Sequence, residues 1–205
     1  MMSDPDRARE LRVVMKRADA GVFMPLLQEG FIVRCKTGIT IEDLLREDFG
    51  IARDYMEKRL STVFLDGQCI DDIDSAIVHG GAVLALSSAM PGLVGATLRR
   101  KGILASMRAS ITHRGQTGQA VSAGEGFVTI KLFNVLAGEL GPVFLARGIY
   151  VKAAGMKDFL QKRGGPFWSA ISRTIFDGRQ IDREKLPDAL GDEAGALIML
   201  RLAAP

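Results

Sequence analysis

The stretch Val63-Phe64-Leu65-Asp66-Gly67-Gln68-Cys69-Ile70-Asp71 occurs a second time, in altered form, as Thr174-Ile175-Phe176-Asp177-Gly178-Arg179-Gln180-Ile181-Asp182. In both copies an Asp-Gly pair stands between apolar residues. This pattern is a strong signal of a β-hairpin, because both central residues of a type I′ turn need a positive φ. We therefore predict a hairpin at the same place in two related halves of the chain.

Four further pairs of similar segments surround these hairpins and follow the same order along the chain. They are 13–16 with 128–131, 30–36 with 148–152, 41–45 with 156–160, and 81–86 with 195–200. A single similar segment arises easily by chance, whereas five in the same order indicate an internal duplication. Each copy reads as strand, strand, helix, two short strands and strand.

The first copy is expected to contain strands at 12–17, 31–36, 62–65 and 82–86, and the second copy opens with a strand at 127–133. Thr40 is the expected N-cap of a helix that reaches about Glu47, with Glu42 and Asp43 in the first turn, where the helix dipole favours acids. The apolar run 82–86 is expected at the centre of its sheet, buried on both faces.

This order of elements is that of the β-grasp, or ubiquitin-like, fold, and the sequence resembles the MoaD and ThiS families of sulfur carriers. The resemblance rests on an opening strand that leads into a short helix, on the Asp-Gly turns, and on a Gly-Asp-Glu motif before an apolar last strand: 128–138, 66–67, 177–178 and 190–200. It implies an α+β fold with two tandem β-grasp domains, residues 11–92 and 126–205, joined by a helical, basic linker, residues 93–125.

Sulfur transfer in this family needs a C-terminal Gly-Gly tail, whose carboxylate is activated. This chain ends in Ala203-Ala204-Pro205, and proline is bulky and lacks the N–H group. The segment 90–95 has the composition of such a tail but is internal. The sequence therefore favours a non-catalytic tandem β-grasp binding or scaffold protein that has a protein partner and no cofactor or metal. Two alternatives stay open, a sulfur carrier activated after processing and a TGS-like RNA-binding module.

The middle of the chain is basic. The net charge of the 205 residues is +3, yet no Asp or Glu occurs between Ser75 and Gly124. This region holds the candidate residues for binding an anion or a partner, which are Arg99, Arg100, Lys101, Arg108 and Arg114. We expect an amphipathic helix over 103–114 and a flexible connection over 115–126. The first interpretation is that this helix packs on a sheet and its arginines are solvated. The alternative is an anion site, formed by the arginines and by glycine-flanked backbone N–H groups near a helix start.

Other chemistry-bearing residues have structural interpretations. The crowded acids Asp66, Asp71, Asp72 and Asp74 lack the spacing of an EF-hand and are expected to serve turns and loops. His79 is expected at a surface turn, because no nucleophile with a supporting acid accompanies it. Cys35 is expected to be buried. The aromatic pair with Trp168, after a Gly-Gly-Pro break, is expected to pack as a lid on the helix of the second domain.

Composition excludes several classes of protein. Two cysteines are too few for a disulfide framework or a four-thiolate metal site, and no apolar run is long enough for a membrane span. The charged start has no signal-peptide core, so a reducing, cytoplasmic location is expected. Aromatic residues make up only 6% of the chain, and they do not alternate with basic residues as base-stacking surfaces require. Nucleic acid is therefore the weaker candidate partner.

Overall fold

The structure is a computed structural model that describes residues 5–15, 20–89, 92–100, 102, 103, 123–191, 193 and 195–203. Helices and mixed β-sheets make up these residues, in agreement with the expected α+β class. The chain divides into two units. Unit 1 combines Met1–Phe31 with Gly138–Pro205, and unit 2 is Ile32–Ala137.

These units do not follow the predicted boundaries, 11–92 and 126–205 with a linker at 93–125. The first strand of each copy lies in a sheet with the other copy. β1 (Arg9–Met15) pairs with β10 (Ile171–Phe176) and with β12 (Leu197–Ala203), whereas β8 (Gly124–Phe133) pairs with β7 (Val83–Ser87). Each copy therefore gives its first strand to the sheet of the other copy, and in unit 1 this strand, β1, takes the place that the last strand β7 has in unit 2. The start of the predicted flexible connection lies outside the described residues, and its last three residues belong to β8.

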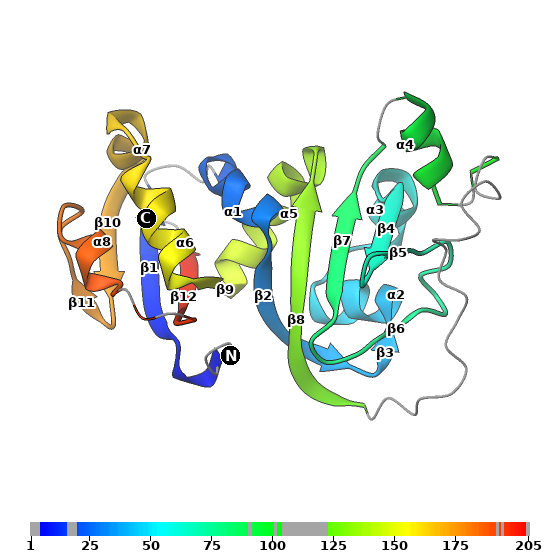
Figure 1. The fold of residues 1–205 in the computed structure, drawn as a ribbon, viewed down its shortest axis with the longest axis horizontal. Coiled ribbons are helices and arrows are strands. Elements are labelled where there is room, and N and C mark those ends of the chain that lie inside the picture. Colours follow the sequence, from blue (N-terminus) through cyan, green and yellow to red (C-terminus); the bar gives the residue numbers. More distant parts are fainter. Residues whose placement is uncertain are drawn as a thin grey trace. The chain divides into compact units, whose positions relative to one another are not determined.

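In unit 2 the strands lie in the order β2, β8, β7, β4, β5 (Figure 1). β8 runs parallel to β7, β7 is antiparallel to β4, and β4 is antiparallel to β5. The bounds of β2 are Phe31–Thr37, those of β4 are Thr62–Leu65, and those of β5 are Gln68–Cys69. β7 has the expected central position, but only alternate side chains, such as Leu84 and Leu86, are fully buried. β3 (Ile39–Thr40) and β6 (Ile77–Val78) form a separate antiparallel pair.

The helices of unit 2 begin with the predicted cap. Thr40 Oγ1 accepts a hydrogen bond from the backbone N–H of Asp43 at 3.0 Å, which confirms Thr40 as an N-cap. The helix runs through α2 (Ile41–Asp43) and a π-helical turn, η3 (Leu44–Asp48), and so ends within one residue of the predicted position. Two further helices, α3 (Arg53–Arg59) and α4 (Gly92–Leu98), complete the described part of the unit.

In unit 1 the strands lie in the order β9, β12, β1, β10, β11 (Figure 1). β12 is antiparallel to β9 and parallel to β1, and β10 is antiparallel to β1 and to β11. The bounds of β9 are Ile149–Lys152, and those of β11 are Arg179–Gln180. Unit 1 therefore repeats the direction pattern of unit 2, with β12 and β1 as the parallel central pair in place of β8 and β7.

Helices bury the core face of the unit 1 sheet. They are α1 (Met24–Glu29), α6 (Ala153–Gln161), α7 (Gly165–Ala170), α8 (Leu186–Ala189) and the part of α5 (Val135–Arg147) from Gly138 on, together with the 3-10 turn η2 (Ala20–Phe23). The 3-10 turn η1 (Pro5–Arg7) precedes β1 and has no buried residue. Gly141 of α5 permits one close contact, because a Cβ there would lie 2.6 Å from Cδ1 of Leu27. Through Leu27, the N-terminal helix α1 thus joins a core built mainly by the second half of the chain.

The two predicted hairpin turns have matching geometry. Asp66 and Asp177 have φ values of 50° and 47°, and each is followed by a glycine with positive φ, as a type I′ turn requires. Asp66 exchanges two hydrogen bonds with the backbone of Val83, at 2.9 Å and 2.8 Å. Asp177 makes the same two bonds with the backbone of Glu10, at 2.9 Å and 3.0 Å. β1 therefore lies beside the Asp177-Gly178 turn in unit 1, in the place that β7 has beside the Asp66-Gly67 turn in unit 2.

Candidate functional site

Arg100, one of the predicted anion-binding residues, is held against unit 2 by its backbone and its side chain. It follows α4 after a single residue. Its backbone N–H donates to the Ser61 carbonyl at 2.8 Å. Its guanidinium group donates to the carbonyls of Asp71 and Leu60, both at 3.3 Å. Arg100 therefore fastens the end of α4 to the segment before β4 and to the loop after β5.

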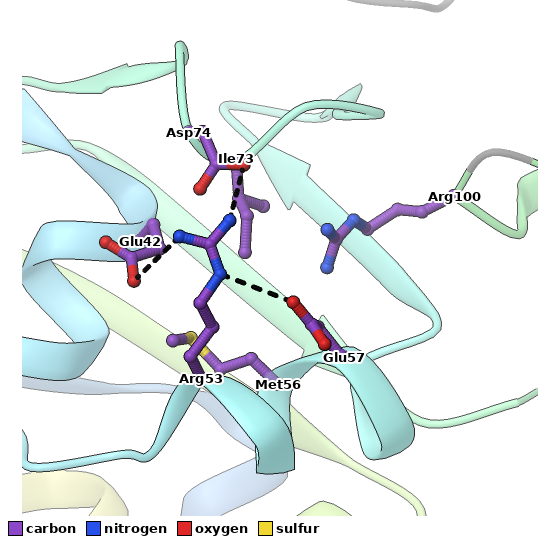
Figure 2. A pocket seen from close by; sticks show the side chains of 7 residues that line it. All are labelled: Glu42, Arg53, Met56, Glu57, Ile73, Asp74 and Arg100. Atoms are coloured by element: carbon purple, nitrogen blue, oxygen red, sulfur yellow. Dashed lines mark hydrogen bonds and ion pairs between the residues drawn. The ribbon is translucent and has the colours of Figure 1, made fainter.

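A small pocket lies beside the Arg100 guanidinium (Figure 2). Its volume is about 50 Å³, and its lining comes from α2, α3, the loop after β5 and the segment after α4: Glu42, Arg53, Met56, Glu57, Ile73, Asp74 and Arg100. Sites for metabolite-sized ligands have volumes of roughly 300–1,000 Å³. The pocket is therefore too small for a metabolite and has room for a few water molecules.

Arg53 of α3 occupies the centre of a charge network in this pocket. Its guanidinium contacts Glu57 at 3.3 Å, Asp74 at 3.3 Å and Glu42 at 3.8 Å (Figure 2). The Glu42 side chain is only 8% exposed and also contacts Nε of Arg46 at 3.0 Å. A buried carboxylate is costly unless it is paired. The two arginines supply this pairing, so the network joins α2, η3, α3 and the loop after β5.

The pKa values of the two pocket arginines shift in opposite directions. The hydrogen bond to Glu57, followed by the charges of Asp74 and Glu42, raises the pKa of Arg53. Burial lowers the pKa of Arg100, although the nearby charge of Asp74 opposes this effect. Because three carboxylates outnumber two guanidinium groups in the lining, the pocket repels anions. These contacts give Arg100 a structural role, and the binding of an anion by Arg100 stays a prediction.

For the other four basic residues of this segment, the structure does not test the predicted anion site. Arg99 is exposed at the end of α4. Lys101, Arg108 and Arg114 lie outside the described residues, as does the predicted helix over 103–114 apart from Ile103. The side chain of Ile103 is 98% exposed. The Arg53 network was not predicted, although Arg53 and Glu57 have the i,i+4 spacing of a helical ion pair.

His79 forms an ion pair that was also not predicted. Its Nε2 lies 2.8 Å from Oδ2 of Asp66, and its Nδ1 lies 2.9 Å from the Gly80 carbonyl. Both contacts are satisfied together only when both ring nitrogens carry a proton. The Gly80 carbonyl and then the Asp66 carboxylate raise the pKa of His79, although burial opposes them. His79 thus binds the turn between β4 and β5 to the segment before β7.

This pair predicts a small pH dependence of stability. Because the pKa of His79 is raised on folding, its contribution is complete below the unfolded value of about 6.5 and is lost as the pH rises through the folded value. The side chain is half exposed, so the contribution is below about 1 kcal/mol. We expect the free energy of unfolding to fall from pH 5.5 to pH 8.5 more in the wild type than in His79→Gln. Urea unfolding at both pH values measures this difference, and equal falls in the two proteins would contradict it.

The acidic loop and the cysteines are accounted for by local contacts. Asp72 accepts hydrogen bonds from the Asp74 backbone at 3.1 Å and from the Ser75 hydroxyl at 2.9 Å, so the predicted loop role of these acids is confirmed. Cys35 is buried, as predicted, and Cys69 is buried too. The Cys69 thiol donates to the Leu98 carbonyl at 3.6 Å, which adds a contact at the end of α4.

Replacing Arg100 by Met is expected to loosen the end of α4 and to expose Cys69. The change removes two hydrogen bonds from a charged donor, each contributing about 1.5–3 kcal/mol. Local opening would therefore raise the rate of thiol alkylation at Cys69 by at least about tenfold. Mass spectrometry of alkylated peptides measures the rate, with buried Cys35 as the internal control and Arg99→Met as the matched variant. A rise of equal size at both cysteines would contradict a local role.

Trp168 lies where the sequence predicts it. Its ring meets Phe167 edge to face at 5.1 Å, and the Phe167 ring packs on Phe159 of α6 at 5.7 Å. The Arg163 guanidinium lies 3.9 Å from the Phe159 ring centre, a favourable cation–π geometry. α7 therefore packs on α6 through Phe167, the partner of Trp168 in the predicted lid.

Two wider searches give negative results for the parts of the chain that the structure describes. No helix within the described ranges has both the length and the apolar character needed to cross a bilayer. Across the same described residues, no group of three or more His, Cys, Asp or Glu side chains is placed to hold a metal ion.

Comparisons with family models, with curated proteins and with solved structures find no match. The relation to sulfur carriers therefore remains a prediction from the motifs of the two copies.

Proposed function

We propose that the chain is a non-catalytic binding or scaffold protein made of two β-grasp-like units, related to the MoaD and ThiS carriers. In a β-grasp the first and last strands are parallel neighbours at the centre of the sheet. Each unit has such a pair, β8 with β7 in unit 2 and β12 with β1 in unit 1. In both units an antiparallel two-strand extension ends the sheet beyond the central pair. These features support a β-grasp-like arrangement with exchanged strands.

The observation that carries the proposed role is the surface of α4. This helix has no charged residue, and the side chains of Leu93 and Val94 are 67% and 68% exposed. Arg100 and Cys69 fix the end of the helix to unit 2, so its apolar side chains are held in place. Adjacent, exposed apolar side chains on a fixed helix are typical of protein docking surfaces. We infer that α4 presents them to a protein partner.

The geometry of the same segment favours docking over sulfur transfer. A carrier tail must be extended so that an activating enzyme can thread it into a narrow site. The segment of the first copy that resembles such a tail contains Gly92 and Gly95. Both glycines lie in α4, and Gly95 is buried. A helical, partly buried segment is a poor substrate for threading.

Site-specific photo-crosslinking in the native cells tests this role. A photoreactive residue at position 93 is expected to form a discrete adduct with one partner, whereas the same residue at exposed position 184 is expected to form none. The purified partner is then titrated with the wild type and with Leu93→Asp/Val94→Asp. Because both side chains are exposed, the double variant should keep its free energy of unfolding and lose at least about tenfold in affinity. Identical adducts at both positions, or unchanged affinity of the double variant, would refute the proposal.

A further inference from the structure

The sheet of unit 1 has an open face that carries arginines. Along β1, Leu11 and Val13 are fully buried, whereas the side chains of Glu10 and Arg12 point to the opposite face and are partly exposed. β12 alternates in the same way, with buried Leu200 on the core face and Arg201 on the open face. Side chains of a strand alternate between the two faces, so Arg12 and Arg201 share one face.

Arg12 and Arg201 are direct neighbours on this face. They are register partners in the parallel pair of β1 with β12, and neighbouring strands lie about 4.8 Å apart. Like charges placed side by side on a sheet are destabilising. Both arginines form an ion pair with one carboxylate, that of Glu10, at 3.2 Å from Arg12 and 4.0 Å from Arg201. Within the described part of the chain, two guanidinium groups therefore share one paired carboxylate.

Both arginines also have unused donors. The Nε atoms of Arg12 and Arg201 are buried and have no hydrogen-bond partner. Arg201 places one terminal nitrogen 3.1 Å from the Arg147 carbonyl. Its guanidinium lies over Gly148, where a Cβ would be 3.5 Å from both Nε and Nη2. The side chains are 43% and 39% exposed, so both groups remain within reach of a ligand from solvent.

The charge around the pair is also positive. Arg173 faces Val14 across β10 and β1, and Lys152 faces Leu197 across β9 and β12, which places both on the open face. Both side chains are exposed. Among the charged residues that the strand registers place on this face, Glu10 is the acid and the four others are basic. Such a surface concentrates anions from solution.

We infer that Arg12 and Arg201 form a binding site for a phosphate group. A guanidinium fork matches the oxygens of a phosphate, and two adjacent forks bind a dianion with charge-assisted hydrogen bonds. A bound phosphate offsets the repulsion between the two arginines and accepts hydrogen bonds from the exposed part of their guanidinium groups. This inference goes beyond the proposed docking role. It concerns unit 1 and not α4, so either can fail while the other stands.

Calorimetric titration of the full chain with inorganic phosphate, in chloride buffer at pH 7.5, tests the site. We expect saturable binding by the wild type. Arg12→Gln and Arg201→Gln should each weaken it by about tenfold or more. The matched control Arg183→Gln removes an arginine that pairs with Glu184 elsewhere on the surface, and it should leave affinity unchanged.

Glu10→Gln provides the most discriminating variant. The Glu10 carboxylate of the wild type competes with phosphate for both arginines, so the removal of this carboxylate should tighten phosphate binding by roughly fivefold. A variant that merely disturbed the fold would weaken binding, so this gain separates a site from a structural effect. No saturable binding by the wild type, an equal loss in Arg183→Gln, or weaker binding by Glu10→Gln would each overturn the inference.

A second titration identifies the source of the phosphate group. Single-stranded oligouridylate is added to the wild type and to Arg12→Gln at increasing salt. Tighter binding than that of inorganic phosphate, a steep loss with salt, and loss in Arg12→Gln would assign the site to a nucleic-acid backbone. Binding of inorganic phosphate without a gain from the oligonucleotide would assign it to a free phosphate or a small phosphorylated molecule. Either result supports the site.

Discussion

Replacing Val13 by Asp is expected to unfold the sheet of unit 1 and to leave the sheet of unit 2 intact. Val13 is 1% exposed at the centre of β1, between β10 and β12. Burying an unpaired carboxylate there should lower the free energy of unfolding of unit 1 by more than about 4 kcal/mol. Hydrogen exchange should then lose protection at 171–176 and 197–203 and keep it at 62–65 and 83–87.

Val128→Asp is the reciprocal variant. Val128 is also 1% exposed, and in the duplication it corresponds to Val13, because it lies at the same position in the first strand of the second copy. It belongs to β8, which pairs with β7, so protection should be lost at 83–87 and 62–65 and kept at 171–176. If each copy kept its own first strand, the two variants would show the opposite patterns.

Phe23→Ala should destabilise unit 1 by about 3–5 kcal/mol. Phe23 is fully buried, and its ring packs on Phe159 at 5.6 Å and on Phe167 at 5.7 Å. The change removes the centre of this aromatic cluster and leaves a cavity between η2, α6 and α7. Because the chain has one tryptophan, Trp168, and its ring contacts Phe167, its fluorescence reports urea unfolding of this unit.

Phe133→Ala serves as the matched control for this prediction. The Phe133 side chain is 37% exposed at the end of β8, so the same chemical change should cost well under about 2 kcal/mol. A Phe23→Ala protein with a midpoint like that of the control would show that the N-terminal turn does not belong to the core of unit 1.

Local features of the fold could be predicted from the sequence, because they depend on neighbouring residues. The Asp-Gly turns need positive φ at both positions, and the structure has it at Asp66 and at Asp177. Thr40 caps its helix because the N–H group three residues later, that of Asp43, has no partner within the helix and donates to the Thr40 hydroxyl. The strands at 31–36, 62–65 and 127–133 were predicted within a few residues for the same reason.

The partner of each first strand could not be predicted in this way. β1 and β8 have similar apolar sequences, since Val13-Val14-Met15 corresponds to Val128-Thr129-Ile130. The apolar pattern therefore does not say which strands will stand beside each of them, and their places, β8 between β2 and β7 and β1 between β12 and β10, depend on contacts between residues far apart in the chain. The predicted domain boundaries assume that each copy keeps its own strand, and the structure assigns these strands differently.

The same limit applies to the candidate sites. The basic run at 99–101 predicts an anion site, but the fold brings Asp74 and Glu57 to the pocket beside Arg100. Nothing local distinguishes the two arginines of the proposed phosphate site, which come from the first and the last strand. Their proximity follows from the pairing of β1 with β12.

Disulfide trapping tests the exchange of first strands most directly. In the structure Val14 faces Arg173 across an antiparallel pair, where Cα atoms lie about 4.5–5.5 Å apart, within the range of a disulfide. If β1 instead paired within its own copy, as β8 pairs with β7, Val14 would take the place of Thr129 beside Val83. In a background with both native cysteines replaced, Val14→Cys/Arg173→Cys should form a disulfide under mild oxidation, and Val14→Cys/Val83→Cys should not. Bond formation in the second pair and not in the first would contradict the exchanged arrangement.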